Sequence, residues 1–321
     1  ASRVISAVTL RGGVSTPEMI KQLNKAVCGP GQEQFLRFLM WLYPGEKQSE
    51  HRGHLSPLEP DLLGEALVVD VLTDADTPSD YLQRVFSNAD VFALETGFKI
   101  LGQISANKQT EGRRWLSQIF EQDAADRLMP AFDAAMSLGK KSAHSVLGSV
   151  LAEKLDQAGT HEHAMRIYKD IPDRPASLGE VAVWATKKLL DELHKTPESL
   201  KTLRERAQLL SNLGGRLGQL RRPEEALASA QKAVDIYRVL VQGRPGVFSS
   251  ALGASLKNPA DALYGQPVRM EPLASVLRIT VDTDLLSMEL PGVFLGPLAN
   301  SLINLGVNLR EMGRREEAMA A

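Results

Sequence analysis

The residues best suited to metal chemistry are the histidines, and their spacing does not favour a site. His161 and His163 lie two positions apart, so on a helix they would point to different faces and could not ligate one ion. A zinc-binding helix would carry its second histidine at position 165, where the chain has Met165. His51 and His54 have no cysteine and no fixed acidic pair nearby. We therefore expect no metal ion.

The sequence favours neither phosphate binding nor nucleophilic catalysis. The segment Gly139–Ser142 resembles the end of a phosphate-binding loop, but Ala134 stands where the first glycine is required. Without that glycine the backbone cannot form the anion cradle. Cys28, the single cysteine, precedes Gly-Pro-Gly and has no histidine at a fixed spacing to activate it. The sequence therefore predicts no nucleotide cofactor and no enzymatic activity in this chain.

The composition limits the classes of partner. The chain has 321 residues, is 43% hydrophobic and carries a net charge of −2, with no strongly basic segment. Nucleic-acid binding needs concentrated positive charge, so we expect no nucleic-acid partner. No apolar run approaches the length of a membrane span, and no signal peptide is visible. A single cysteine is typical of a reducing compartment, which predicts a cytoplasmic protein.

A repeat organises the C-terminal part of the chain. Pro-Gly-Val-Phe occurs at Pro245–Phe248 and again at Pro291–Phe294, 46 residues apart (291 − 245). The two clearest copies of the unit are Leu209–Ala228 and Ser301–Ala320, 92 residues or two periods apart (301 − 209). A fixed period of this size indicates stacked supersecondary units, which usually work by offering a binding surface.

Each repeat reads as two antiparallel helices. In the first copy, four leucines recur at helical spacing, and Pro223 then suits the first turn of a second helix. The acidic Glu224 and Glu225 favour the positive N-terminal end of that helix. Small residues at Gly214 and Ala230 allow the two helices to approach closely. The sequence therefore predicts one helical hairpin per repeat.

These residues resemble tetratricopeptide repeats. The pattern Asn-Leu-Gly followed by Glu-Glu-Ala-Leu is similar to that family, and the long period resembles the variety found in kinesin light chains and bacterial signalling proteins. The resemblance is specific for residues 200–321. The middle copy, Leu256–Leu290, departs from the pattern because Pro259, Pro267 and Pro272 disfavour helix, so we expect a distorted hairpin there.

The N-terminal segment, residues 1–75, has a different organisation. Ala1–Leu10, Pro17–Val27 and Gln32–Leu42 read as helices, and the turn-rich Tyr43–His54 follows them. Three helices and a short ribbon are the order of a winged helix. Its expected second and third helices carry few basic residues, so we expect it to pack within the protein and not to bind DNA.

Two further segments extend the resemblance. Pro57–Glu65 is similar to the stretch after the winged helix in bacterial STAND-type signalling NTPases, and Ile171–Val183 resembles the stretch leading into their tetratricopeptide arrays. Residues 76–195 have helical periodicity and read as degenerate hairpins. The sequence thus predicts an all-α superhelix of tetratricopeptide-like hairpins with a small winged-helix-like domain. The expected segments are the winged-helix-like domain at 1–75, the degenerate hairpins at 76–195 and the tetratricopeptide repeats at 196–321.

The predicted function is a non-enzymatic protein-protein interaction module. The resemblance implies the sensor or scaffold part of a larger signalling NTPase, of which this chain would be a fragment, with any oligomer formed through the full-length protein. One alternative is a free-standing peptide-binding adaptor, which the absence of an upstream phosphate loop would indicate. Another is a helical-repeat enzyme, which would need perturbed carboxylates or histidines gathered in one pocket.

The candidate site is a row of asparagines. Asn212, Asn258 and Asn304 follow one another at 46-residue intervals, so equivalent positions of successive hairpins would carry one amide each. An amide offers two donors and one acceptor, which suits an extended peptide backbone. In related repeats, asparagines at this point of the first helix line the concave groove, so we expect a protein or peptide ligand there. The alternative is that each asparagine only bonds a neighbouring helix.

Overall fold

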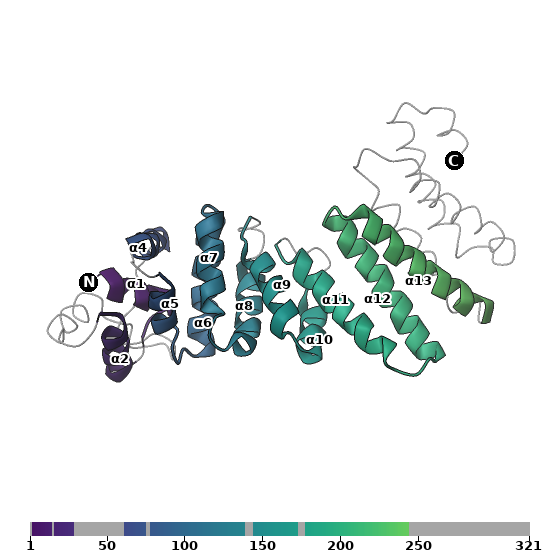
Figure 1. Cartoon of the computed structure of the whole chain (residues 1–321), viewed down its shortest axis with the longest axis horizontal. Coiled ribbons are helices and arrows are strands. Elements are labelled where there is room, and N and C mark those ends of the chain that lie inside the picture. Colours follow the sequence, from purple (N-terminus) through teal and green to yellow (C-terminus); the bar gives the residue numbers. More distant parts are fainter. Residues whose placement is uncertain are drawn as a thin grey trace, which may run out of the picture. The chain divides into compact units, whose positions relative to one another are not determined.

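All regular structure in the described part of the chain is helical. The computed structural model describes residues 2–14, 16–28, 61–74, 78–138, 144–172 and 177–243, and Figure 1 labels their helices. Contacts divide the chain into an N-terminal unit, Ala1–His163 with Pro175–Val181, and a C-terminal unit, Ala164–Arg174 with Ala182–Ala321. None of the helices in the described ranges is long and apolar enough to span a bilayer. The predicted all-α fold of tetratricopeptide-like helical repeats is thus confirmed.

The helices vary from 8 to 21 residues. In chain order they are α1 (Ser2–Leu10), α2 (Pro17–Cys28), α4 (Asp61–Asp74), α5 (Pro78–Val85), α6 (Val91–Ser105), α7 (Gln109–Ile119), α8 (Ala124–Leu138), α9 (Leu147–Ala158), α10 (His161–Asp170), α11 (Gly179–His194), α12 (Leu200–Gln219) and α13 (Pro223–Gly243).

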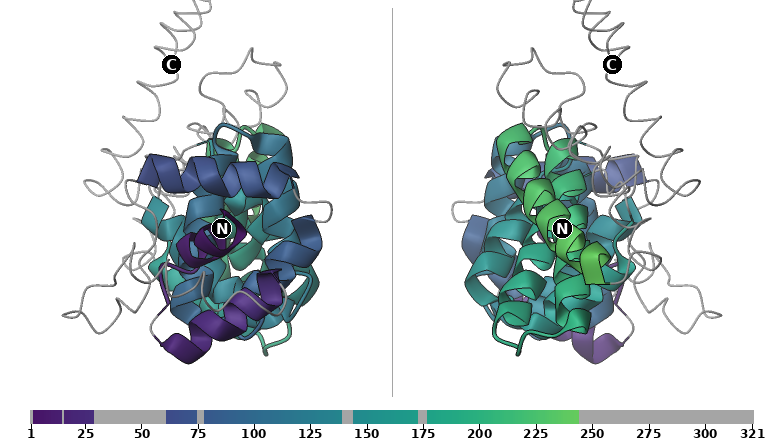
Figure 2. Two further views of the ribbon diagram at one scale, coloured as in Figure 1. Left: turned by 90° about the vertical axis from the view of Figure 1, so that its left-hand side faces the viewer. Right: turned by 90° about the vertical axis from the view of Figure 1, so that its right-hand side faces the viewer.

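The N-terminal unit is built around α6, which packs against α7 and α8, while α8 also packs on α9. Its core holds several fully buried aromatic side chains, among them Trp115 and Phe132. The rings of Phe98 and Phe120 lie 4.9 Å apart between centroids. Toward the N-terminus, α1 packs on α2 and α4, and α2 on α5 (Figure 2, left). Burial of these large side chains stabilises the unit by about 1.5–3 kcal/mol each.

Glycines allow two close backbone approaches in this unit. A Cβ built on Gly148 of α9 would lie 1.9 Å from the carbonyl oxygen of Ser177. One built on Gly112 of α7 would lie 2.5 Å from the Cβ of Ser105 on α6. Both distances are below the contact limit of carbon and oxygen atoms, so these two contacts require a residue without a side chain.

The C-terminal unit contains the predicted hairpin. Helices α12 and α13 pack along their length (Figure 2, right). Leu210, Leu213 and Leu217 of α12 form a buried cluster with Ala226 and Ala233 of α13. Pro223 begins α13, with two glutamates in its first turn. The predicted hairpin and the helical phase of its leucines are confirmed here.

The turn between these helices uses an arginine where glycine is usual. Arg222 N donates to Leu217 O at 3.0 Å and Arg221 N donates to Gly218 O at 3.0 Å, the two bonds of a Schellman motif. Arg221 has a φ of +57°, in the left-handed region. The motif therefore forms despite the steric cost of a Cβ at this position.

Two details within residues 76–195 were not predicted from the sequence. Helix α9 begins at Leu147, and Val146 N donates to Ser105 Oγ at 3.2 Å, which ties the preceding turn to α6. Helix α10 was not predicted either. Only Ala164 and Ile167 of α10 are buried, which is too few for a recognisable apolar stripe.

Other predictions fall outside the described residues. They are the third N-terminal helix at Gln32–Leu42, the ribbon at Tyr43–His54, the middle repeat at Leu256–Leu290 and the copy at Ser301–Ala320. Helices α1 and α2 lie close to where the first two were expected, yet the winged-helix arrangement stays a prediction. The divisions at 75 and 195 stay predictions too.

Candidate functional site: the polar network around Asn212

Asn212 lies on α12 and reaches across to α10. Its amide nitrogen donates to the hydroxyl of Tyr168 at 2.6 Å. Its amide oxygen accepts from Nε2 of Gln208, one turn earlier on α12, at 3.1 Å. The side chain is half-buried, so it remains reachable from solvent. Asn212 therefore joins two helices of the C-terminal unit through one hydrogen bond.

The network continues from Gln208 to α13. The hydroxyl of Tyr237 donates to Oε1 of Gln208 at 3.3 Å. The Tyr237 side chain is 1% exposed, and its burial raises the pKa of the phenol. The phenol therefore stays protonated at neutral pH and acts as a donor. This bond gives the buried hydroxyl a partner, as buried polar groups require.

On the other side, Arg216 connects the network to α11. Its guanidinium carbon lies 4.9 Å from the centroid of the Tyr168 ring. Nη1 of Arg216 donates to Ala182 O at 2.9 Å and also bonds the hydroxyl of Thr186. Cation–π contacts of this kind contribute about 0.5–2 kcal/mol. Arg216 thus holds the Tyr168 ring in place while Asn212 holds its hydroxyl.

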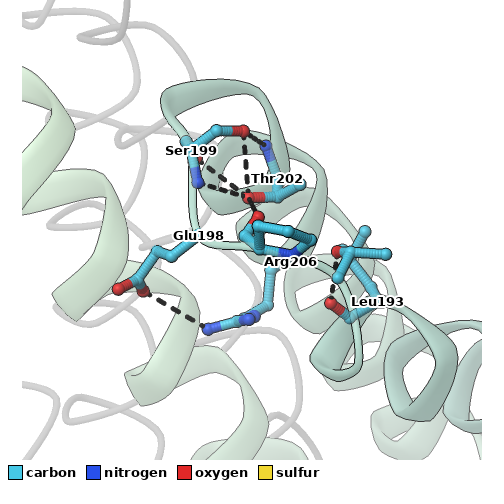
Figure 3. A network of polar contacts seen from close by, with 7 residues as sticks. Leu193, Glu198, Ser199, Thr202 and Arg206 are labelled. Carbon is cyan, nitrogen blue, oxygen red and sulfur yellow. Dashed lines mark hydrogen bonds and ion pairs between the residues drawn. The ribbon is translucent and has the colours of Figure 1, made fainter.

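The turn before α12 fixes where that helix begins (Figure 3). Thr202 N donates to Ser199 Oγ at 3.1 Å, and Ser199 N donates to Thr202 Oγ1 at 2.8 Å, a reciprocal capping box. Nη1 of Arg206 lies 3.8 Å from a carboxylate oxygen of Glu198. Since the cap sets the first residue of α12, it also sets which face carries Gln208 and Asn212.

The chemistry of this network is recognition by hydrogen bonding. Its members are two amides, two phenols, a guanidinium and a buried threonine hydroxyl, contributed by four helices. None of these is a carboxylate or an imidazole suited to proton transfer near neutral pH. The arrangement offers donors and acceptors on a supported framework, which suits binding of a polar backbone.

The histidine and cysteine candidates from the sequence are not part of this network. Nδ1 of His163 accepts from Thr160 N at 3.2 Å, so this histidine caps the start of α10. Across the described ranges, no three or more His, Cys, Asp or Glu side chains are grouped to hold a metal. Cys28 is a half-buried free thiol. Asn258, Asn304 and the segment Gly139–Ser142 lie outside the described residues.

The partners of Asn212 were not predicted from the sequence. Gln208 and Arg216 lie four residues before and four residues after Asn212 on α12, so all three share one helix face. That spacing was available as a signal of a polar stripe. Tyr168 gave no signal, because it is 44 residues away in the chain and its helix was not predicted.

Comparison with known proteins places the α12 and α13 residues of this network within a repeat, while Tyr168 and Thr186 lie outside the matched residues. A family model described as tetratricopeptide repeat matches residues 206–242, which span most of α12 and α13. Searches of curated proteins and of solved structures found no match. The matched region is similar to tetratricopeptide repeats, and at this general level the chain is a protein-protein interaction module.

Proposed function

We propose that the chain binds an extended peptide on the face of α12 that carries Asn212, as the sensor or scaffold part of a larger signalling NTPase. The observation that supports this most directly is the hydrogen bond from Asn212 to Tyr168, which presents the amide at a fixed position within the matched repeat. A fixed amide loses little conformational entropy when it binds a ligand.

The amide keeps capacity for a ligand. Nδ2 has two hydrogens, and the bond to Tyr168 uses one of them. The oxygen has two lone pairs, and Gln208 uses one. A peptide amide group could therefore bond Asn212 while both intramolecular bonds persist. Asn258 and Asn304 would offer the same groups in later repeats.

The first experiment separates a binding role from a structural role. Peptides are selected from a phage-displayed random 12-residue library against the whole chain, and their affinity is measured by fluorescence polarisation. Asn212→Ala removes the amide and should weaken binding by about 0.5–1.5 kcal/mol, the worth of one neutral hydrogen bond. Tyr168→Phe removes the same intramolecular bond and leaves the amide in place.

The two variants should lose similar stability but differ in binding. If Tyr168→Phe binds as the wild type does and Asn212→Ala does not, the amide contacts the peptide. Equal losses in both variants would show that Asn212 acts only by joining α12 to α10. A selection that enriches no peptide on the wild type would contradict the peptide-binding surface itself.

The signalling context rests on the resemblance of Pro57–Glu65 and Ile171–Val183 to segments of STAND-type NTPases. It predicts that the gene encodes a phosphate-binding loop upstream of Ala1. Reading the full open reading frame tests this directly. An open reading frame with no such loop would favour the free-standing peptide-binding adaptor.

A further inference from the structure

A cavity in the N-terminal unit lies apart from the Asn212 network. It has a volume of about 560 Å³ and is bounded by the end of α1, one face of α2, and α5 with the turn that follows it. These helices are neighbours in Figure 1, and α2 packs on both α1 and α5. Binding cavities for small molecules typically have 300–1,000 Å³. The cavity is therefore large enough for a small organic molecule.

Arg11 is the unusual residue of this cavity. Its side chain is only 8% exposed, yet within the described ranges it makes a single long hydrogen bond, from Nη2 to Asn88 O at 3.4 Å. A guanidinium has five N–H donors. Burial lowers the pKa of Arg11, with Asp90 acting in the opposite direction. A buried charge with so few partners is costly unless something else pairs with it.

A second buried arginine of the same unit shows the contrast. Arg127 is 5% exposed, and its guanidinium donates to two backbone carbonyls, those of Ile119 and Phe86. These bonds join the ends of two helices, which is a structural role. Arg11 lacks a comparable set of partners. Arg11 lines the cavity, whereas Arg127 does not.

The remaining charges around the cavity favour an anion. Lys25 and Arg84 also line it, and no carboxylate does among the residues that the structure describes. Arg84 is paired with Asp80 at 2.6 Å, so its charge is partly neutralised. Burial lowers the pKa of Arg11, and the negative charge of Asp90 partly offsets this effect. The carboxylate of Asp90 also accepts from Ala93 N at 2.8 Å as the cap of α6. The described residues that line the cavity therefore carry a net positive charge.

We propose that this cavity binds a small organic anion whose carboxylate or phosphate group pairs with Arg11. The planar guanidinium matches either group in a two-bond geometry. Lys25 at the rim adds a second positive charge. Met19, Leu23 and Ala26 supply an apolar wall for the carbon skeleton of the ligand. This proposal is independent of the peptide-binding surface on α12.

The test measures thermal stabilisation of the whole chain by three probes at constant ionic strength. Inorganic phosphate tests binding of free phosphate, and glycerol 3-phosphate tests binding of an organic phosphate ester. Glutarate tests binding of an organic carboxylate. A ligand that binds only the folded state raises the melting temperature as its concentration exceeds its Kd. We expect at least one probe to do so, with affinity confirmed by calorimetry.

Variants assign the effect to the cavity. Arg11→Gln should weaken the bound probe at least tenfold, since a charge-assisted pair is lost. Lys25→Gln should weaken it about threefold, since a solvent-exposed charge contributes less. Lys21→Gln is the matched control, because Lys21 is an exposed lysine of the same helix that does not line the cavity.

Stability without ligand gives a second measurement. Arg127→Gln should lower the melting temperature, because two buried carbonyls lose a charged donor and, among the described residues, Phe86 O keeps only its bond from Ala89 N. Arg11→Gln should leave the melting temperature unchanged or raise it, because it removes a poorly paired buried charge. If Arg11→Gln does not fold, the proposal is tested by comparing the probe affinity of Lys25→Gln with that of Lys21→Gln. No stabilisation by any probe, or stabilisation that survives in the Arg11 and Lys25 variants, would overturn the proposal.

Discussion

Close packing at helical glycines differs between the two units. At Gly148 in the N-terminal unit, an added Cβ would meet the Ser177 carbonyl oxygen at 1.9 Å. At Gly214 in the C-terminal unit, an added Cβ would lie 3.1 Å from Ala226 O and 3.3 Å from the Cβ of Ala230. The first contact has no room for a side chain, whereas the second is only tight. Close packing depends on one glycine in the first case.

In the C-terminal hairpin, close packing is shared among several small residues. Gly214 on α12 faces Ala226 and Ala230 on α13, and Ala233 continues the same buried face. A shared pattern of small residues recurs in the sequence and can be recognised. A single glycine at a close contact carries no such pattern. This difference explains why the hairpin was predictable and the glycine contacts of the N-terminal unit were not.

The largest effect is expected from Gly148→Ala. The new methyl group would overlap backbone atoms of Ser177, which cannot rotate away. After the gain in helix propensity from alanine, we expect the free energy of unfolding to fall by about 2–3 kcal/mol. Urea unfolding followed by circular dichroism measures this. A loss below 1 kcal/mol would mean that the segment around Ser177 moves aside at little cost.

A smaller loss is expected from Gly12→Ala. Gly12 ends α1 with a φ of +71° and its added Cβ would lie 2.9 Å from Cε1 of Phe92. The left-handed backbone alone costs a non-glycine residue about 1–2 kcal/mol. We expect a loss of about that size in urea unfolding, with faster hydrogen exchange at the end of α1. Unchanged exchange in α1 would contradict this account.

The matching substitution in the hairpin, Gly214→Ala, should be nearly neutral. A gain in helix propensity of up to about 1 kcal/mol opposes a small displacement of α13 from its contact with Ala226 O. We expect the free energy of unfolding to change by less than about 1 kcal/mol in either direction. A loss as large as that of Gly148→Ala would remove the distinction between the two units.

The smallest effect is a gain, from Arg221→Gly. Arg221 holds a φ of +57° at an exposed Schellman position, where α1 instead has Gly12. Glycine relieves the left-handed strain but has more freedom in the unfolded chain, so we expect a net stabilisation of about 0.5 kcal/mol. The melting temperature measures it. A decrease would show that the Arg221 side chain contributes contacts that outweigh the strain.

The sequence predicted part of the candidate site. The 46-residue spacing identified Asn212, and the same helix face carries Gln208 and Arg216 at intervals of four. The partner Tyr168 was not predictable, because α10 has too weak an apolar pattern to be recognised. Whether Asn258 and Asn304 share the arrangement of Asn212 stays a prediction, since they lie outside the described residues.

The sequence by itself determined the α12–α13 hairpin, through leucines at helical spacing, Pro223 at the start of α13 and the acidic residues after it. These signals act within one or two helical turns, so the local order of residues suffices to read them. Only the tertiary structure brought Tyr168 to Asn212, 44 residues apart, and Arg11 to Asn88, 77 residues apart. Such pairs depend on how helices pack, which no local pattern encodes.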